Sequence, residues 1–420
     1  MKRTPMSFVF AYFLFFSLAT TTFSCSKDSE LLSEVIDIDT VTEVTEPKST
    51  GSNPTGTVTD STLIDTTTAV LPVGPDKNFP LNTELTITGN QFYINGRLTY
   101  EGRYWQGNKI EGLLMNSRMV QGIFDDLNPT TSKLFAYPDT NTWNANRNTD
   151  EFVMAMQEWK NNGLLAFTLN LQGGSPTGYN NAQAWLNSAF DENGGLRPAY
   201  MNRLQRILNK ADELKMVVIL GYFYFGQDQV LANEAAVING VDNITDWILN
   251  EGYRNLLIEI NNECDISAYN HAILRPNRVH ELINRVKQKQ KNGFRLLVST
   301  SFKGGAVPTA NVVQASDYLL LHGNGVSQPA GITSLINATR NVSGSGNKPI
   351  INNEDDHYNF DANENNFKAS VQGYVSWGFF DFRRQGEAFS EGFQSVPVDW
   401  GINSARKRDF FAKVKEITGY

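Results

Sequence analysis

The strongest constraint on the fold is an alternation of short apolar runs with longer amphipathic segments, which continues from about residue 112 to the C-terminus. Eight runs have the length and composition of buried strands, and they lie at residues 112–117, 164–170, 216–223, 255–261, 294–300, 317–323, 348–354 and 375–382. Helical periodicity fills several of the intervals, at residues 150–162, 198–215, 277–292 and 404–417. Near-continuous apolar strands separated by helices predict a parallel sheet covered by helices.

Eight strands, each followed by a helix or a long loop, predict an α/β protein of the (β/α)8 barrel type. A doubly wound sheet is the alternative, but no Gly-rich phosphate loop follows the first predicted strand. The stretch "LTITGNQFYINGRLTYEGRYW", residues 85–105, has two alternating apolar runs broken at Gly-Asn and Asn-Gly. It predicts a β-hairpin that closes one end of the barrel. We therefore assign residues 81–420 to a barrel with an N-terminal hairpin.

The N-terminus reads "MKRTPMSFVFAYFLFFSLATTTFSC", with basic residues, an apolar run and then Cys25. This pattern predicts a signal peptide over residues 1–24, and Cys25 resembles the lipidated cysteine of bacterial lipoproteins. The alternative is that Cys25 is an ordinary residue of a cleaved signal. Residues 25–80 are dense in Thr and Ser without an apolar face, which predicts a disordered tether. We expect a lipid-anchored protein of the bacterial outer membrane, exposed at the cell surface.

Charge and cysteine content narrow the choice of partner and compartment. The formal net charge is −8, and Lys and Arg occur only in short groups on predicted helix faces. The electrostatic footprint of a nucleic-acid-binding protein is therefore missing, and a neutral or polymeric substrate is expected. Of the two cysteines, only Cys264 lies within the predicted barrel, so an intrachain disulfide is not expected there.

In a (β/α)8 barrel the chemistry lies at the carboxyl ends of the strands. Two of the predicted strands end in a carboxylate, the fourth in "IEINNECD" with Glu263 and the seventh in "PIINNEDD" with Glu354. Strands four and seven stand on opposite sides of an eight-strand ring, so these carboxylates can face each other across its opening. A facing pair is what glycoside hydrolysis requires, with one group protonating the leaving oxygen and the other stabilising or attacking the anomeric carbon.

These residues also carry a resemblance to a known family. "LLIEINNECD", residues 256–265, resembles the fourth strand of clan A glycoside hydrolases, especially family 5, and "PIINNEDD" is similar to the seventh strand, which delivers the nucleophile. "SWGFF", residues 376–380, resembles the eighth strand, whose Trp floors the sugar site. The resemblance covers about residues 85–420. It implies a retaining enzyme without a cofactor, in which Glu263 is the acid/base, Glu354 the nucleophile, Asn262 a sugar ligand and Trp377 a stacking platform.

The remaining candidates for carbohydrate binding lie at other strand ends, and they are Arg118, Asn170, Tyr222, His322, Asn324 and Asp355. Three positions depart from the family 5 pattern, since Cys264 replaces the usual Pro, Asn324 the usual aromatic residue and Asn170 a His-bearing loop. They favour a distant or separate clan A family. Aromatic residues in predicted loops, such as Tyr179 and Trp185, agree with a carbohydrate ligand.

Several roles stay open from the sequence. Arg118 either contacts the nucleophile and lowers its pKa or makes a structural ion pair. His322 either contacts substrate or nucleophile or is a satisfied barrel histidine. Glu259 is expected in a buried ion pair, and Cys264 as an inert packed thiol. We expect Glu354 to have a low pKa and Glu263 to keep its proton near neutral pH, with the two carboxyl groups roughly 5–6 Å apart.

Two rival functions remain. The acidic run from Glu354 to His357 offers carboxylates and one imidazole, which would suit a metal-dependent hydrolase. Adjacent strand residues point to opposite faces, however, which disfavours a shared ion. The second rival is a non-catalytic surface lipoprotein that binds glycans, and it is disfavoured because both carboxylates are present.

Overall fold

The computed structural model describes residues 81–179 and 184–420. The expected signal peptide, the tether and Cys25 lie outside the described residues. None of the described helices combines the length and the apolar character needed to cross a membrane.

The centre of the fold is a sheet of eight parallel strands. They are β6 (Asn116–Arg118), β7 (Ala166–Asn170), β8 (Val217–Phe223), β9 (Leu256–Asn261), β10 (Leu297–Ser299), β11 (Leu319–His322), β12 (Ile350–Asp355) and β13 (Ser376–Phe379). The order in the sheet is β10-β9-β8-β7-β6-β13-β12-β11, so the last strand returns to pair with the first. The Asp317 N–H donates to the Val298 carbonyl oxygen and links the start of β11 to β10 across the remaining gap. The predicted (β/α)8 barrel is confirmed, and each predicted strand overlaps an observed one.

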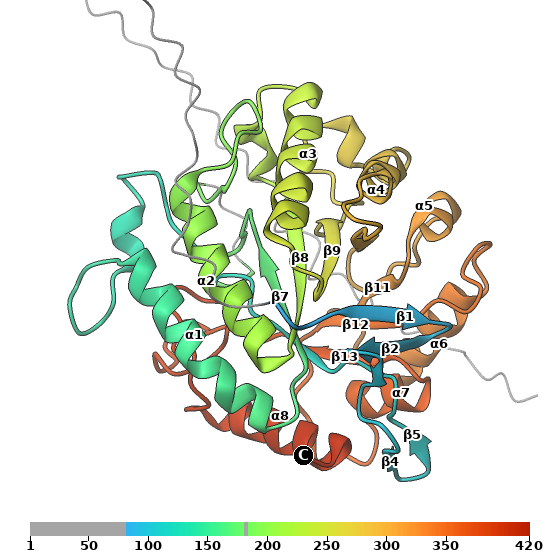
Figure 1. The fold of residues 1–420 in the computed structure, drawn as a ribbon. Coiled ribbons are helices and arrows are strands. Elements are labelled where there is room, and N and C mark those ends of the chain that lie inside the picture. The colour runs from blue at the N-terminus through green and yellow to red at the C-terminus, as the bar shows by residue number, and fades with distance from the viewer. Residues whose placement is uncertain (1–80, 180–183) are drawn as a thin grey trace, which may run out of the picture. The chain divides into compact units, whose positions relative to one another are not determined.

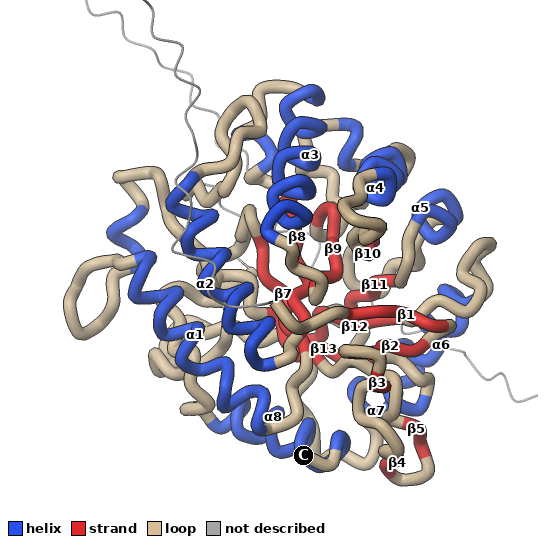
Figure 2. The backbone as a smooth tube through the Cα atoms, viewed as in Figure 1, coloured by secondary structure: helices blue, strands red, loops and turns tan. Residues whose placement is uncertain are grey.

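Helices surround this ring of strands (Figure 2). They are α1 (Ala145–Asn161), α2 (Pro198–Leu214), α3 (Glu234–Glu251), α4 (Val279–Gln288), α5 (Ala310–Ala315), α6 (Pro329–Arg340), α7 (Asn366–Gln372) and α8 (Ala405–Thr418). Short 3-10 turns lie at η2 (Ser132–Phe135), η3 (Asp228–Val230) and η4 (Ala272–Leu274). Asn144, Asn233 and Ser404 begin their helices by accepting a backbone N–H in the first turn, which is the standard role of such caps.

A small antiparallel sheet covers the amino ends of the barrel strands (Figure 1). It consists of β1 (Leu85–Thr88), β2 (Gln91–Ile94) and β3 (Arg97–Leu98), and a separate ribbon, β4 (Tyr104–Trp105) with β5 (Asn108–Lys109), follows it. The Leu85 N–H donates to the Arg254 carbonyl and the Phe92 N–H to the Gly112 carbonyl, just before β9 and β6. Leu85 and Phe92 are buried beneath this sheet. The predicted hairpin that closes one end of the barrel is confirmed.

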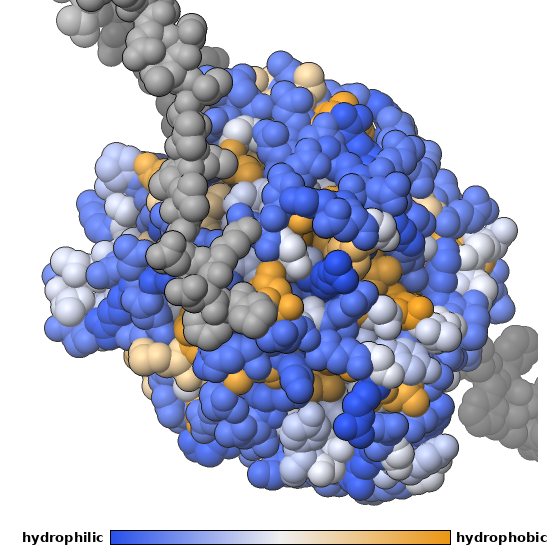
Figure 3. All heavy atoms as spheres, in the orientation of Figure 1, coloured by the Kyte–Doolittle hydropathy of each residue, from blue (hydrophilic) through white to orange (hydrophobic). Residues whose placement is uncertain are grey.

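Burial explains why the strands are apolar almost throughout. Every residue of β7, β8 and β9 is buried, because the inner face fills the barrel and the outer face packs against helices. Phe152 and Trp159 of α1 pack edge to face, and Trp400 contacts both rings. The surface shown in Figure 3 is mostly hydrophilic with small apolar spots, as expected for a folded domain.

Candidate active site

The two predicted carboxylates meet at the carboxyl end of the barrel, here called the mouth and defined by the C-terminal ends of β6 to β13. Glu263 follows β9 and Glu354 lies near the end of β12, and both are buried. His322, at the end of β11, stands between them, with its Nδ1 3.0 Å from Glu263 Oε1 and 3.4 Å from Glu354 Oε2. One oxygen of each carboxylate and a ring nitrogen of His322 all lie within 4.8 Å of one another. The fold therefore brings together the ends of the fourth and seventh strands, and it adds a histidine that contacts both.

Glu354 is held by an ion pair and a hydrogen bond. Arg118 Nη1 lies 2.9 Å from Glu354 Oε2, and Asn324 Nδ2 donates to Glu354 Oε1 at 2.9 Å. Arg118 is itself buried, and its Nε donates to Gln394 Oε1 at 3.1 Å. Since both contacts favour the ionised carboxylate, Arg118 is a partner of the candidate nucleophile and not a remote structural ion pair.

Burial and the nearby Arg118 cation shift the pKa values of Glu263 and Glu354 in opposite directions. Burial raises the pKa of Glu263 to about 7, although Arg118 lowers it. Burial also raises the pKa of Glu354, so the expected low pKa is not found, but the Arg118 cation opposes that rise. Because a cation and an amide N–H contact the Glu354 carboxylate directly, Glu354 is the better candidate for the ionised form and Glu263 for the protonated form. Burial lowers the pKa of His322 to about 4, so its imidazole is neutral near pH 7.

The backbone turns sharply at Glu263, and hydrogen bonds from neighbouring strand ends hold it there. Glu263 has φ of 50°, in the left-handed region, and this is where the strand turns into the loop. The Asn262 N–H donates to the Phe223 carbonyl at 3.0 Å, and the Glu263 N–H donates to Ser301 Oγ at 2.9 Å. The Tyr269 hydroxyl donates to the Asn262 carbonyl. Neighbouring strand ends therefore fix the segment that carries the candidate acid.

Three buried amides offer atoms that the described part of the protein leaves without partners. Both amide atoms of Asn170 and the Oδ1 atoms of Asn262 and Asn324 are in this condition. The Asn170 side chain lies over Gly221 of β8, where an added Cβ would come within 2.3 Å of its Oδ1. Buried amides are normally hydrogen-bonded, so these atoms are suited to the hydroxyl groups of a ligand. Asn324 donates to Glu354, Asn262 precedes Glu263 in the chain, and Asn170 stands at the end of β7. That the three bind a sugar stays a prediction.

The prediction that Trp377 is a stacking platform is wrong. Trp377 is fully buried and stacks on Phe367 of α7, with ring centroids 4.5 Å apart and planes 13° apart. The next residue, Gly378, faces the other way, since a Cβ there would meet Asn116 Oδ1 at 2.2 Å. Successive side chains of a strand point to opposite faces, and Trp377 occupies the outer one, between the barrel and its helices.

The predictions that Tyr222 and Asp355 bind substrate are also wrong, because both side chains point to the outer face of their strands. The Tyr222 hydroxyl lies 3.3 Å from Thr245 Oγ1 of α3, on the outer side of β8. Asp355 follows the inward-facing Glu354, and its carboxylate accepts from Trp377 Nε1 at 3.1 Å and contacts His357 Nδ1 at 2.7 Å. Its oxygens are therefore engaged by the protein, and neither residue is placed to bind substrate.

The aromatic residues that do reach the mouth come from elsewhere. Tyr179, in the Gly/Asn-rich loop after β7, is 49% exposed, and its hydroxyl donates to Asp356 Oδ2 and accepts from Asn324 Nδ2. Its ring meets the edge of Phe380, which in turn lies beneath the Arg118 guanidinium at 5.8 Å. The sequence analysis identified Tyr179 as an aromatic residue of a loop. It did not identify Phe380, because the resemblance assigned the aromatic role on this strand to Trp377.

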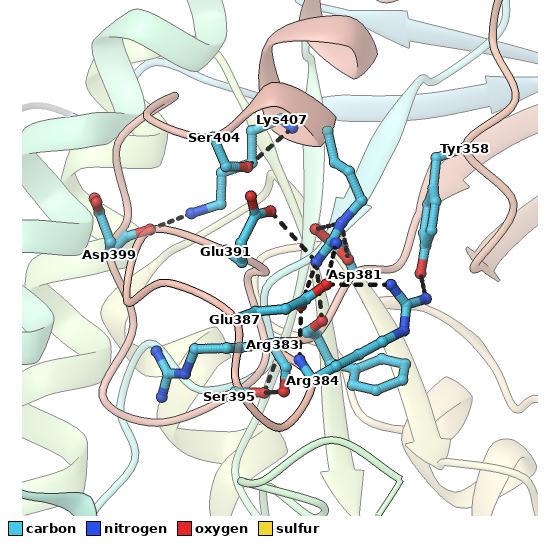
Figure 4. Close-up of polar contacts among 12 residues, drawn as sticks. Tyr358, Asp381, Arg383, Arg384, Glu387, Glu391, Ser395, Asp399, Ser404 and Lys407 are labelled. Carbon is cyan, nitrogen blue, oxygen red and sulfur yellow. Dashed lines mark hydrogen bonds and ion pairs between the residues drawn. The ribbon is translucent and has the colours of Figure 1, made fainter.

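The loop after β13 supplies Gln394, a residue that no sequence pattern singled out. Asp381, Glu387 and Glu391 converge in Figure 4, and each pairs with Arg406 of α8, with Arg406 Nε 3.0 Å from Asp381 Oδ1. These ion pairs anchor the loop after β13. Gln394 of the same loop accepts from Arg118 Nε and donates to the Ser175 carbonyl at 3.2 Å, so it joins Arg118 to the loop after β7.

The acidic run from Glu354 to His357 does not form one ligand set. Glu354 faces Arg118 in the mouth, whereas Asp355 faces Trp377. Asp355, Asp356 and His357 still offer three ligand atoms within 4.8 Å of one another. These three residues are therefore the part of the metal-site hypothesis that the geometry leaves standing.

Two neighbours of the acid were assigned structural roles from the sequence. Cys264 is buried, and burial raises the pKa of its thiol, which agrees with an inert thiol. Glu259 is buried too, but the expected ion pair is wrong: among the described residues it makes no ion pair, and its Oε1 accepts the hydroxyl of Ser301.

Comparison with known proteins gives fold-level neighbours. No protein-family profile matches the sequence. No curated protein matches it either. Solved structures that resemble it include an endo-1,4-β-mannanase from Rhizomucor miehei, at 10% identity and TM-score 0.49, covering 80% of this chain and 99% of that one. A broad-specificity endoglucanase of subfamily GH5-4 from Clostridium acetobutylicum has 11% identity and TM-score 0.47, covering 72% of this chain and 96% of that one.

A third neighbour comes from Bacteroides vulgatus and is described as a candidate glycoside hydrolase. It has 12% identity and TM-score 0.47, and the match covers 78% of this chain. The match spans only 59% of that longer protein. The chemistry of the site therefore has to follow from its own side chains.

Proposed function

We propose that the protein is a retaining glycoside hydrolase that works by double displacement. One observation carries the proposal: Glu263 and Glu354 face each other in the mouth, with one oxygen of each carboxylate within 4.8 Å of the other. Retaining enzymes place their two carboxyl groups about 5–5.5 Å apart, whereas inverting enzymes leave about 6.5–9.5 Å for a water molecule. The close approach supports the retaining arrangement.

In the first step the Glu354 carboxylate attacks the anomeric carbon while the bond to the leaving oxygen breaks. Glu263 transfers its proton to that oxygen, and a covalent glycosyl-enzyme forms. In the second step Glu263 accepts a proton from water, the water oxygen attacks the anomeric carbon, and Glu354 leaves as a carboxylate. Arg118 and Asn324 stabilise that carboxylate whenever it is free, because Arg118 forms an ion pair with one oxygen and Asn324 donates a hydrogen bond to the other.

The substrate is a carbohydrate in this proposal. The unpaired amide atoms of Asn170, Asn262 and Asn324 match sugar hydroxyls, and the half-exposed Tyr179 ring offers a face to the C–H groups of a sugar.

The test is hydrolysis of a panel of aryl glycosides and polysaccharides, with the first-formed anomer identified by proton NMR. We expect product with the anomeric configuration of the substrate. A product of inverted configuration would replace double displacement by a single displacement. Binding of glycans without hydrolysis of any of them would favour the non-catalytic surface protein.

A metal-dependent hydrolase is the second candidate, because Asp355, Asp356 and His357 can converge on one ion. Activity should be unchanged after treatment with EDTA if Glu263 and Glu354 carry the reaction. Loss of activity with EDTA, restored by a divalent cation, would favour this alternative. His357→Ala separates the two candidates further, since it removes one of the three ligands without touching either glutamate.

We also propose that the protein is anchored to the bacterial outer membrane through a lipid on Cys25, followed by the tether of residues 25–80. Support comes from the order of basic, apolar and small residues before Cys25. Cys25→Ala should move the protein from the membrane fraction to the soluble fraction with its glycosidase activity intact. Retention of the variant in the membrane fraction would contradict the anchor.

A further inference from the structure

The candidate acid is held in an uncommon backbone conformation. Glu263 has φ of 50°, a region that residues other than Gly, Asn and Asp rarely adopt. In this conformation its carboxyl reaches His322, with Oε1 3.0 Å from Nδ1. A conformation of this kind persists only where the surrounding structure fixes it. The residues that fix Glu263 therefore control where its proton is delivered.

Ser301, which follows β10, makes two of the contacts that hold this segment. Its hydroxyl oxygen accepts the Glu263 N–H at 2.9 Å, and its carbonyl oxygen accepts the Cys264 N–H at 2.9 Å. Ser301 is fully buried, so water does not compete for these two contacts. One residue therefore holds the peptide groups on both sides of the Glu263 side chain.

Glu259 completes the arrangement from within β9. It is fully buried, and its Oε1 accepts the proton of the Ser301 hydroxyl. A hydroxyl has a single proton, so donating it to Glu259 turns a lone pair of the same oxygen toward the Glu263 N–H. The two steps of the proposed reaction leave this buried carboxyl without any role in the chemistry.

We propose that Glu259 and Ser301 are positioning residues for the general acid, in which Glu259 orients the Ser301 hydroxyl and Ser301 holds the backbone of Glu263. The catalytic consequences rest on the proposed glycosidase function. The conformational consequence does not, because it concerns only the placement of Glu263 beside His322.

The charge of Glu259 has a second effect, on the pKa of Glu263. The charges of Arg118, Glu354 and Glu263 influence the pKa of Glu259, and those of Arg118, Asp265 and Lys303 influence the pKa of Glu263. His322 also contacts the Glu263 carboxyl. Burial raises the pKa of Glu259 to about 7, so this carboxyl is partly ionised near neutral pH. Repulsion by the Glu263 carboxylate is one of the causes that raise the pKa of Glu259, and since repulsion between like charges is mutual, an ionised Glu259 favours the protonated form of Glu263.

The first experiment compares Ser301→Ala with Ser299→Ala. Ser299 is a buried serine two residues earlier on β10, and its hydroxyl contacts Ser316 rather than Glu263, which makes it a matched control. Ser301→Ala should lower kcat/KM roughly 10-fold to 100-fold on glycosides with poor leaving groups, a part of the about 10²–10⁴-fold that general acids contribute. On activated aryl glycosides, which depart without a proton, it should change less than about threefold. Equal losses on both substrates would indicate a merely structural role and overturn the proposal.

The second experiment separates orientation from charge at Glu259. Glu259→Gln keeps an acceptor for the Ser301 hydroxyl but loses the charge, so the alkaline limb of kcat/KM should move to lower pH because the pKa of Glu263 falls. Glu259→Leu should add the selective loss on poor leaving groups. An unmoved alkaline limb in Glu259→Gln, together with an equal loss on both substrates in Glu259→Leu, would remove Glu259 from the proposal.

The third experiment does not depend on activity. In crystal structures of the two serine variants, Ser301→Ala should release Glu263 from the left-handed region and from His322, whereas Ser299→Ala should leave both features in place. An unchanged Glu263 in Ser301→Ala would overturn the proposal. If the wild-type protein hydrolyses no glycoside, the proposed function fails, and this structural comparison still decides whether Ser301 positions Glu263.

Discussion

The two ends of the barrel differ in what their residues do. At the amino end, β1 to β3 cover the strands with apolar side chains such as Leu85 and Phe92, and backbone hydrogen bonds join the cover to the barrel. At the mouth, Glu263, Glu354, His322 and Arg118 are buried together, and several amide atoms have no partner among the described residues. The comparison teaches that stability and chemistry occupy opposite ends of the same strands. Buried charges and unpaired amides cost stability, so they are expected only where function requires them.

The largest expected effect comes from removing the proposed nucleophile, Glu354, at the mouth. Glu354→Gln should lower kcat by on the order of 10⁵-fold on every substrate, because no other group can form the covalent intermediate. The free energy of unfolding should also fall, since the substitution keeps a similar shape but leaves the buried Arg118 cation without its counter-charge. Steady-state kinetics and urea unfolding measure the two effects. A folded variant that keeps its activity would contradict the proposed role of Glu354.

Removal of the proposed acid, Glu263, should have a smaller effect that depends on the substrate. Glu263→Ala should cost about 10²–10⁴-fold in rate on glycosides with poor leaving groups and spare the first step on activated aryl glycosides. Azide should then rescue turnover and give a glycosyl azide of retained configuration, whereas rescue of a Glu354→Ala variant should give inverted configuration. Product analysis by NMR reads this out, and the opposite pattern would mean that the two roles are exchanged.

At the amino end the effect should fall on stability alone. Phe92→Ala removes a buried ring and should lower the free energy of unfolding by about 3–4 kcal/mol. The kcat of the folded enzyme should stay within about twofold of wild type, because general acid and nucleophile lie at the far end of the strands. Tyr104→Ala, at a 57% exposed position, is the control and should cost less than about 0.5 kcal/mol. A large loss of kcat in the folded Phe92→Ala protein would break the comparison.

The smallest expected effect is a shift in the pH dependence of kcat/KM. Burial raises the pKa of Glu263 to about 7, and since the acid works in its protonated form, kcat/KM should fall as the pH rises through that value. Glu354 works in its ionised form, so Arg118→Gln should raise its pKa and move the acid limb of kcat/KM to higher pH by about 1 unit or more. Arg118→Lys keeps a cation and should move that limb less. An acid limb that does not move in Arg118→Gln would exclude Arg118 as the group that keeps Glu354 ionised.

The comparison also shows how far pattern reasoning reaches. The eight strands and the end-closing hairpin followed from hydrophobic periodicity, because a buried strand must be apolar wherever it stands in the fold. Glu263 and Glu354 followed from the rule that strand ends form the mouth. Trp377, Tyr222 and Asp355 did not, because a one-residue change of phase exchanges the inner and outer faces of a strand. The register between β12 and β13 shifts between Asn352 and Asp355. Which side chains near Glu354 point into the barrel therefore depends on pairing with the neighbouring strand.

By itself the sequence determined the barrel, its covered end and the two carboxylates, since each of these depends on local spacing of apolar and polar residues. Only the tertiary structure decided how the site is supported. Arg118 and Gln394 are 276 positions apart in the chain, and Glu259 and Ser301 are 42 apart, yet each pair is joined by a hydrogen bond. Such contacts arise when separate strand ends converge at one mouth, and local periodicity holds no information about which loop side chain will arrive there.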